Sequence, residues 1–448
     1  MIIEQLSEYA ADQIGTGLSP QVSHAAKRAL VDWFAALFPG TQMQPANALM
    51  QAHAHELGLG QASLPGMTTT AFPATAAWIN GSVSHAAEFD DIFRDAIYHP
   101  GCPTIAAALA VAEHRRASGQ RLLEAITVGY EISTRIGVAV QPSHYKYFHT
   151  TGTVGCFGGA AASAVLLSNE ASVTAHALAT SASFASGLQQ AFRSDAMTKA
   201  AHAGHAAWVG VTSALGAEKG LTGVLDILEG SAGFGAALAD APEWSKATDE
   251  LGKRYNIESM TVKNHGCCGH TFASIDGLLA LRAQHGFGFD EIQEITISTY
   301  AAALEVAGIQ EPKSPFECKF SLPYVVAHAA KYGSVRLSAF NPDRIFDADL
   351  RRLMPRITLQ ADPELSRRFP NMRAAGICVR LKNGQAFEHF QPFRIGDPES
   401  PLSDEQISDK FLELAAPVIS DATAKRLLNR LWSIDQLSDV QMLELRTL

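Results

Sequence analysis

Acidic residues and histidines are concentrated in the segment HAAEFDDIFRDAIYHPGCP, residues 85–103. It places Glu88, Asp90 and Asp91 between His85 and His99, directly before the apolar run TIAAALAVAEH. Imidazoles beside carboxylates can take up and release protons near neutral pH. Because a solvated acidic loop needs no histidine at each end, we interpret this segment as a candidate acid–base site.

Three further polar segments interrupt apolar surroundings. They are YFHTTGTVG with His149, Thr151 and Gly152, TKAAHAGHAAW with Lys199, His202 and His205, and VKNHGCCGHTF with Lys263, His265 and His270. A helix that begins after His149 would offer free N–H groups to an anion. Spacing by three places Lys199, His202 and His205 on one face of a helix.

Each of these segments has an ordinary structural explanation when taken alone. A single helix histidine is usually a core or surface residue, and an acidic run is usually solvated. Their recurrence between apolar helices indicates buried ionisable groups with shifted pKa values. Lysines and histidines together bind carboxylates and move protons, so the residues predict an enzyme that acts on a small acid.

The sequence lacks the motifs that would indicate several other classes of protein. No G-x-S-x-G or phosphate-binding lysine loop occurs, Cys267 and Cys268 are adjacent rather than spaced as C-x-x-C, and GTVGCFGG follows no strand. A net charge of −10 without a basic block excludes nucleic acid as a partner. Six scattered cysteines and an acidic N-terminus predict a soluble, cytoplasmic protein that does not enter a membrane.

Apolar periodicity predicts a mainly α fold with two domains. Residues 1–255 and 396–448 form a large all-helical domain, in which helices end at Pro39-Gly40 and at Gly119. Residues 256–395 form a smaller α+β domain with strands at EITISTY and RITLQADPE. A hairpin at GICVRLKNGQAFEHF turns at Asn383-Gly384, the pair typical of a type I′ turn. Ser403 and Gln406 have the spacing of a capping box that begins a final helix.

With these motifs the chain resembles the MmgE/PrpD superfamily, which includes 2-methylcitrate dehydratase, cis-aconitate decarboxylase and iminodisuccinate epimerase. The most specific matches are NGSVSHAAEFDD, HPGCPTIAAALAVAE, FHTTGTVGCFGGAAAS, TKAAHAGHAAWVGV and KFSLPYVVAHA. The resemblance implies a helical domain and a smaller α+β lid with the active site between them, and a homodimer. It also implies a small di- or tricarboxylate substrate, with no metal and no cofactor.

Carried over residue by residue, the resemblance implies two groups of site residues. The group expected to carry out or tune proton transfer comprises His99, His149, Lys199, Lys263, Asp90, Asp91 and Tyr324. The group expected to contact the substrate comprises Glu88, Thr151, Gly152, His202, His205 and His270.

The chain departs from the dehydratase pattern at three positions. Dehydratases carry Asp in the position of Glu88, Thr in that of Ile92 and Arg in that of His205, and a histidine cannot clamp a carboxylate in two-point fashion as arginine does. We therefore expect a cofactor-independent epimerase of an iminodisuccinate-like dicarboxylate. A 2-methylcitrate-type hydro-lyase and a cis-aconitate-type decarboxylase are the alternatives.

Two other classes stay open on the residues alone. A metalloenzyme would use His85 and Glu88 with Asp91 and His99, and would lose activity to a chelator. A non-catalytic protein that kept the fold would bind polycarboxylates without exchanging a proton.

Overall fold

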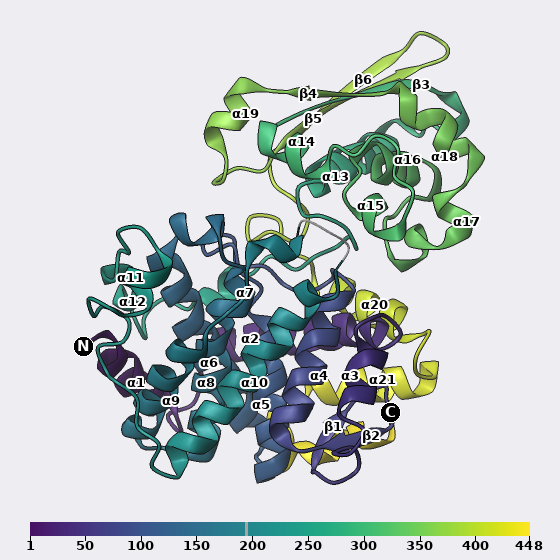
Figure 1. Ribbon diagram of the computed structural model, residues 1–448. Helices are drawn as coiled ribbons and strands as arrows, with labels where there is room; N and C mark the ends of the chain where they lie inside the picture. The colour runs from purple at the N-terminus through teal and green to yellow at the C-terminus, as the bar shows by residue number, and fades with distance from the viewer. Residues whose placement is uncertain (193–195) are drawn as a thin grey trace. The chain divides into compact units, whose positions relative to one another are not determined.

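The computed structural model describes residues 1–192 and 196–448. The chain divides into a helical unit, Met1–Thr261 with Ser403–Leu448, and a second unit, Val262–Leu402 (Figure 1). Both divisions fall later in the sequence than the expected boundaries at 255/256 and 395/396. The predicted mainly α class is confirmed, with strands few and short.

The helical unit is formed by both ends of the chain. Its helices are α1 (Ile2–Gln13), α2 (Pro20–Thr41), α3 (Ala46–Ala52), α4 (Pro73–Ala86), α5 (Gly101–Arg115), α6 (Gly119–Val140), α7 (Thr150–Thr153), α8 (Gly155–Leu167), α9 (Ala171–Phe184), α10 (Thr198–Glu218), α11 (Phe234–Leu238), α12 (Ser245–Thr248), α20 (Asp404–Ala415) and α21 (Asp421–Trp432). The unit is not all-helical as expected, because β1 (Ala62–Leu64) and β2 (Thr69–Ala71) pair antiparallel.

Helix α8 packs against α5, α6, α9 and α10 in the core of this unit. Small residues make the close packing possible: a Cβ added at Gly210 of α10 would lie 2.5 Å from the backbone of α8. Residues Thr150–Leu167 have the length and hydropathy of a membrane span, but 94% of them are buried inside the protein. This stretch therefore has the character of a core helix.

Two predicted helix ends are wrong. Helix α2 continues through Pro39 and Gly40 to Thr41, and a Cβ at Gly40 would lie 1.8 Å from the carbonyl oxygen of Val83 in α4. Gly119 does not end α5; the left-handed residue there is Arg116, with φ 53°, and Gly119 is the first residue of α6. Both glycines allow backbones to approach, which the local sequence does not reveal.

The second unit contains α13 (Phe272–His285), α14 (Ala301–Ala307), α15 (Pro315–Lys319), α16 (Leu322–Tyr332), α17 (Pro342–Ile345), α18 (Ala348–Leu353), α19 (Pro363–Arg368) and four strands, β3 (Ile292–Thr299), β4 (Ile357–Ala361), β5 (Ala375–Leu381) and β6 (Ala386–Gln391). The strand order is β4-β3-β5-β6. Strand β3 pairs parallel to β4 and antiparallel to β5, and β5 pairs antiparallel to β6. Helix α13 packs against β5 and β6.

The predicted hairpin is confirmed, but its turn differs from type I′. A type I′ turn needs positive φ at both central residues, and here Gly384 has φ 88° whereas Asn383 does not have positive φ. The amide of Gly384 donates to the carbonyl of Leu381, and the amide of Leu381 donates to the carbonyl of Gln385. This is the pattern of a longer loop in which glycine takes the left-handed position.

The predicted capping box of the final segment is confirmed. The amide of Gln406 donates to the Ser403 hydroxyl at 3.2 Å, and the amide of Ser403 donates to the Gln406 side chain at 2.8 Å. Helix α20 then packs on α2. Inside this contact the Lys410 ammonium donates to Asp32 at 2.5 Å and to the carbonyl oxygen of Phe89 at 2.9 Å. Helix α20 thereby holds the acidic loop that follows α4.

Candidate active site

The acidic loop lies between the end of α4 and the start of α5. His85 occupies the last turn of α4 and is buried. Glu88 then adopts φ 62°, a left-handed conformation that costs a residue with a Cβ free energy. Phe89 is buried, and its carbonyl oxygen accepts from Lys410. Burial of Phe89 and the lysine contact fix the turn, so that the loop re-enters the protein at Asp90.

The Asp90 carboxylate contacts two histidines through one oxygen. Its Oδ2 atom lies 2.7 Å from Nδ1 of His85 and 2.9 Å from Nδ1 of His99, and it also accepts from the Cys102 thiol at 3.3 Å. The Asp90 side chain is 2% exposed and that of His99 is 19% exposed. A buried carboxylate at this distance can stabilise positive charge on the His99 ring.

Asp91 faces away from the histidines. Its carboxylate accepts from the Tyr130 hydroxyl at 2.7 Å and from the amide of Gly101 at 3.0 Å. A Cβ at Gly101 would lie 2.8 Å from Oδ1 of Asp91 and 2.8 Å from the Tyr130 hydroxyl oxygen, so this position requires glycine. Burial raises the pKa of Asp91 to about 7, against the lowering effect of the Tyr130 hydrogen bond. Asp91 therefore anchors the His-Pro-Gly turn and does not contact either imidazole.

A second histidine pair joins α7 to α10. Nδ1 of His149, which precedes α7, lies 3.0 Å from Nδ1 of His202 in α10. His149 is buried and His202 is half-buried. Burial, reinforced by the neighbouring cationic groups, holds the pKa of His149 well below its usual value, and burial lowers that of His202 to about 4. Both rings are therefore neutral near pH 7.

The two histidine pairs lie beside each other in the helical unit. The ring of His85 lies 4.9 Å from that of His99 and 5.6 Å from that of His149, centroid to centroid. His85 thus contacts both the imidazole that lies beside a carboxylate and the one that lies beside another imidazole. The described structure brings together groups from residues 85–99, 149 and 199–202, which are widely separated in the sequence.

Lys199 forms an ion pair with Glu88, and both side chains are mostly buried, at 14% and 16% exposed. This contact joins the first turn of α10 to the acidic loop. The Thr151 hydroxyl oxygen accepts from the backbone amide of His99 at 3.3 Å, so it helps to hold the backbone that carries this imidazole. A Cβ at Gly152 would lie 2.7 Å from the carbonyl oxygen of Ser186, so Gly152 permits close packing there.

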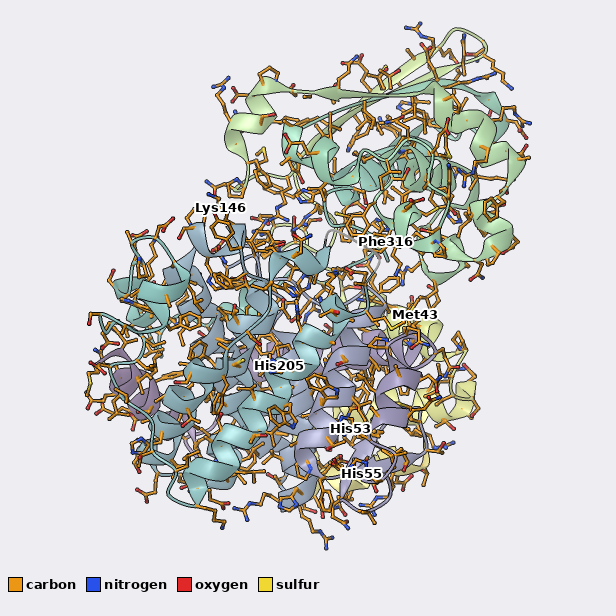
Figure 2. The ribbon with its side chains drawn as sticks, viewed as in Figure 1. Met43, His53, His55, Lys146, His205 and Phe316 are labelled. Atoms are coloured by element: carbon orange, nitrogen blue, oxygen red, sulfur yellow. The ribbon has the colours of Figure 1, made fainter. Side chains whose placement is uncertain are left out.

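His205, labelled in Figure 2, is a half-buried residue of α10. Its ring packs edge-on against Trp78 at 5.9 Å and stacks with Trp208 at 6.3 Å. Its Nδ1 atom lies 3.4 Å from the Ser186 hydroxyl. Although it shares a helix face with Lys199 and His202, these contacts make His205 a packing residue in the helical unit.

The remaining expected site residues belong to the second unit. Lys263 is buried near its start, and His270 bonds the Tyr300 hydroxyl at 2.7 Å. Burial lowers the pKa of His270 to about 3. Tyr324 is fully buried in the hydrophobic core of this unit, and its hydroxyl donates to the carbonyl oxygen of Ala339. That position explains Tyr324 as a core residue with a satisfied hydroxyl.

Several residues of these networks carry no local signal in the sequence. Tyr130 and Lys410 sit in ordinary amphipathic helices, and their roles depend on contacts 39 and 321 residues away along the chain. In the second unit, Asp276 of α13 binds His265 Nε2 at 2.9 Å and the amide of Ile395 at 2.8 Å. A charged residue on an otherwise apolar helix face was the one available indication of such a contact.

One group of ligand atoms is close enough to consider a metal ion. Those of His85, Asp90 and His99 all lie within 4.8 Å of one another. Two of the separations are 2.7 and 2.9 Å, whereas donors around a tetrahedral zinc, each at about 2.0–2.2 Å, stand roughly 3.4 Å apart. The Asp90 oxygen therefore lies closer to both rings than zinc ligands lie to one another, and a cation would have to spread the three groups apart.

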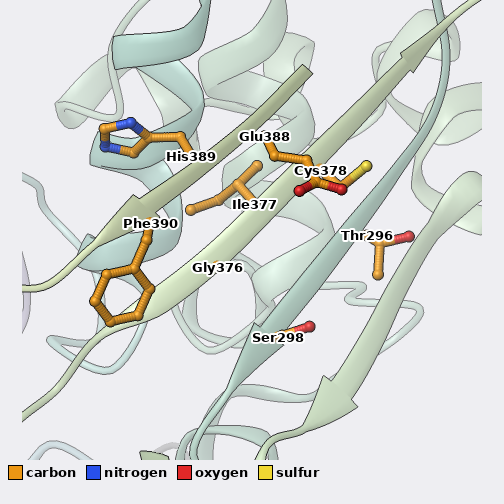
Figure 3. A pocket seen from close by; sticks show the side chains of 8 residues that line it. All are labelled: Thr296, Ser298, Gly376, Ile377, Cys378, Glu388, His389 and Phe390. Carbon is orange, nitrogen blue, oxygen red and sulfur yellow. The ribbon is translucent and has the colours of Figure 1, made fainter. Parts of the chain in front are cut away.

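A separate hollow of about 360 Å³ lies on the sheet of the second unit (Figure 3). It is lined by Thr296, Ser298, Gly376, Ile377, Cys378, Glu388, His389 and Phe390. None of the site residues expected from the sequence lines it.

A mainly helical unit that gathers paired histidines and a lysine–carboxylate pair, together with a smaller α+β unit, defines a protein suited to acid–base chemistry on an anion. The chain belongs to the MmgE/PrpD family. The MmgE/PrpD N-terminal domain matches residues 4–247, and the MmgE/PrpD C-terminal domain matches residues 265–434. These matches place the protein among the enzymes of that superfamily.

Curated relatives cover almost the whole chain. A cis-aconitate decarboxylase-like protein, oryM of Aspergillus oryzae, is 26% identical over 99% of this chain and 96% of its own length. The human cis-aconitate decarboxylase is 27% identical over 95% of this chain and 90% of its own length. The cis-aconitate decarboxylase of Aspergillus terreus is 22% identical over 99% and 95%.

Proposed function

We propose that the protein transfers a proton at a carbon next to a carboxylate of a small di- or tricarboxylate, with no metal and no organic cofactor. The observation that carries this proposal is the pair of imidazoles, His99 and His149, each held by a different partner. His99 lies beside a carboxylate and His149 beside another imidazole, so the two rings should differ in proton affinity. Acid and base roles require such a difference.

His99 is proposed as the base. The buried Asp90 carboxylate stabilises the imidazolium that forms when Nε2 takes a proton, as carboxylates do behind other catalytic histidines. The Thr151 hydroxyl accepts from the His99 backbone amide, and the Asp91 carboxylate accepts from the amide of Gly101 in the turn that follows. These contacts fix the ring without occupying Nε2 themselves.

His149 is proposed as the second proton carrier. Burial makes its charged form unfavourable, so a proton accepted from the substrate is passed on readily, and a proton held there is donated readily. The rings of His149 and His99 both contact that of His85, at centroid distances of 5.6 and 4.9 Å. Two carriers on separate elements suit removal and return of a proton at different faces of one carbon.

Lys199 is proposed as the carboxylate ligand in the helical unit. The substrate carboxylate would share or replace Glu88 as its partner, and the ammonium would stabilise the enolate-like charge that forms on proton removal. Lys263 and His270 remain candidate substrate ligands on the family motif. We assign no role in the reaction to Tyr324 or His205, because each is engaged in packing.

Epimerisation of an iminodisuccinate-like dicarboxylate is the first reaction we propose. Two proton carriers favour it, and so do the departures at Glu88, Ile92 and His205 from the dehydratase pattern. Decarboxylation of cis-aconitate is the second candidate, favoured by the names of the relatives, although they share only 22–27% identity. There, the same enolate-like charge would follow loss of carbon dioxide, and an imidazole would protonate the carbon.

Proton NMR in D₂O tests the proposal on iminodisuccinate stereoisomers, cis-aconitate, citrate and 2-methylcitrate. Deuterium entering the carbon next to the carboxylate with inversion supports epimerisation. Loss of carbon dioxide from cis-aconitate supports the second candidate, and a new vinyl signal from a hydroxy acid would replace both with dehydration. A reaction abolished by a chelator and restored by a metal ion would contradict the metal-free proposal.

A further inference from the structure

The imidazole of His149 is enclosed, yet it contacts a histidine that is not. His149 is 2% exposed, and its Nδ1 atom lies 3.0 Å from Nδ1 of the half-buried His202. Two Nδ1 atoms at this distance share one proton, because one ring must donate and the other must accept. In the neutral pair the donating ring carries its proton on Nδ1, and the accepting ring carries its own proton on Nε2.

We propose that His202 is a proton relay that connects His149 to the solvent, an inference that rests on the proposed function. When Nε2 of His149 takes a proton from substrate carbon, its Nδ1 proton passes to Nδ1 of His202. His202 then carries two ring protons and releases the one on Nε2 to water or buffer. Each ring ends with the number of protons it held before, and the reverse sequence delivers a proton to carbon.

The surroundings of the pair suit a relay rather than a static contact. The backbone at residues 186–187 packs on this region, since a Cβ at Gly152 would meet Ser186 and His202, and one at Gly187 would meet the His202 ring at 3.5 Å. His202 is therefore held in place on α10 while remaining partly accessible. Burial lowers its pKa to about 4, so the cationic form would be short-lived and would release its proton rapidly.

The relay has a consequence for isotope exchange. Hydrogen handled by His149 equilibrates with bulk water during turnover, because His202 passes it outward. Without His202 the proton stays on the enclosed ring and returns to the carbon from which it came. Loss of the relay should therefore slow solvent exchange and make turnover depend on small diffusible buffers.

The test compares His202→Ala and His202→Gln with the parent and with His114→Ala, which removes an exposed histidine at the end of α5. We expect kcat to fall about 10- to 100-fold in both His202 variants at low buffer concentration. Added imidazole should restore His202→Ala in a saturable manner, and deuterium incorporation per turnover should drop. The His114 variant should match the parent.

Two results would overturn the relay. One is unchanged kcat and exchange in both His202 variants; the other is a loss of kcat that imidazole does not restore, which would mark a structural role. If the parent acts on no compound of the panel, the proposed function fails separately. The relay is then judged by ¹⁵N NMR of labelled histidines, where exchange of the His149 Nδ1 proton with water should slow about 10-fold or more in His202→Gln, and an unchanged rate would overturn it.

Discussion

Nδ1 of His99 lies 2.9 Å from Oδ2 of Asp90, with the aspartate enclosed and the histidine partly exposed. The carboxylate is therefore placed to stabilise a protonated His99 ring. Because the same oxygen also contacts His85, the position of Asp90 depends on the end of α4 as well as on the His-Pro-Gly turn. Proton transfer at His99 should accordingly depend on an acid that never touches the substrate.

Asp90→Asn should lower kcat by about 10²- to 10⁴-fold while KM changes little, because the amide cannot stabilise an imidazolium. Steady-state kinetics with a thermal unfolding scan would measure this. Asp91→Asn is the matched control, since Asp91 contacts neither imidazole, and its loss of kcat should be at least about 10-fold smaller. Equal losses in the two variants would show that the acids act only by holding the loop.

Lys199→Ala should raise KM about 10- to 100-fold, since a charge-assisted bond to a carboxylate contributes about 1.5–3 kcal/mol. Glu88→Gln should not raise KM, because it removes the anion that competes with the substrate for the lysine. Lys219→Ala, at a side chain 78% exposed, serves as the control. If Lys199→Ala retains the KM of the parent, the proposed carboxylate ligand is wrong.

The motifs of the sequence correctly indicated which segments of the helical unit lie together, because several polar groups within apolar helices must meet at a shared interior. They did not indicate which partner each side chain faces. Asp90 and Asp91 are adjacent and chemically alike, yet one meets histidines and the other meets Tyr130. His202 and His205 share a helix face, but only His202 reaches His149, since neighbouring tryptophans hold His205.

The elements of the fold could likewise be predicted where they depend on local sequence, and not where they depend on tertiary contacts. The strands, the hairpin and the capping box depend on residues close in sequence, and they were predicted from local patterns. Gly119 was misinterpreted because its function is tertiary: a Cβ there would lie 1.7 Å from the carbonyl oxygen of Ile434. A local sequence pattern around Gly119 cannot reveal a contact with a residue more than three hundred positions away.

The ion pair between Lys410 and Asp32 should be important for stability as a pair. Both side chains are at most 1% exposed. Lys410→Met would therefore leave the buried Asp32 carboxylate without its lysine partner and lower the free energy of unfolding by about 3–5 kcal/mol. The double variant Lys410→Met with Asp32→Asn should regain most of that free energy in urea unfolding. Its kcat should stay low, because the Phe89 carbonyl loses its donor. A single variant as stable as the parent would contradict this.

Asp91 should make stability depend on pH. Its pKa is about 7 in the folded protein and 3.8, the ordinary value of an aspartate, in the unfolded chain, so between these values the folded state keeps a proton that the unfolded state has released. Stability from this group is complete below pH 3.8 and is lost as pH rises to about 7, by up to about 1.4 kcal/mol per pH unit.

Asp91→Asn does not titrate, so its stability relative to the parent should rise between pH 4 and 7 and level off above. Urea unfolding of both proteins across that range measures the difference. Burial also raises the pKa values of Glu113 and Glu131 to about 7, but these groups are present in both proteins and cancel. A difference that does not change with pH would mean that Asp91 is ionised throughout.

The most direct test of proton transfer by His99 is deuterium incorporation from D₂O into substrate carbon, followed by proton NMR in the parent and in His99→Asn. We expect the parent to label the carbon next to a carboxylate. His99→Asn should keep the parent's unfolding midpoint and label at least about 10²-fold more slowly. Labelling at the parent's rate in a folded His99→Asn protein would contradict the assignment of His99 as the base.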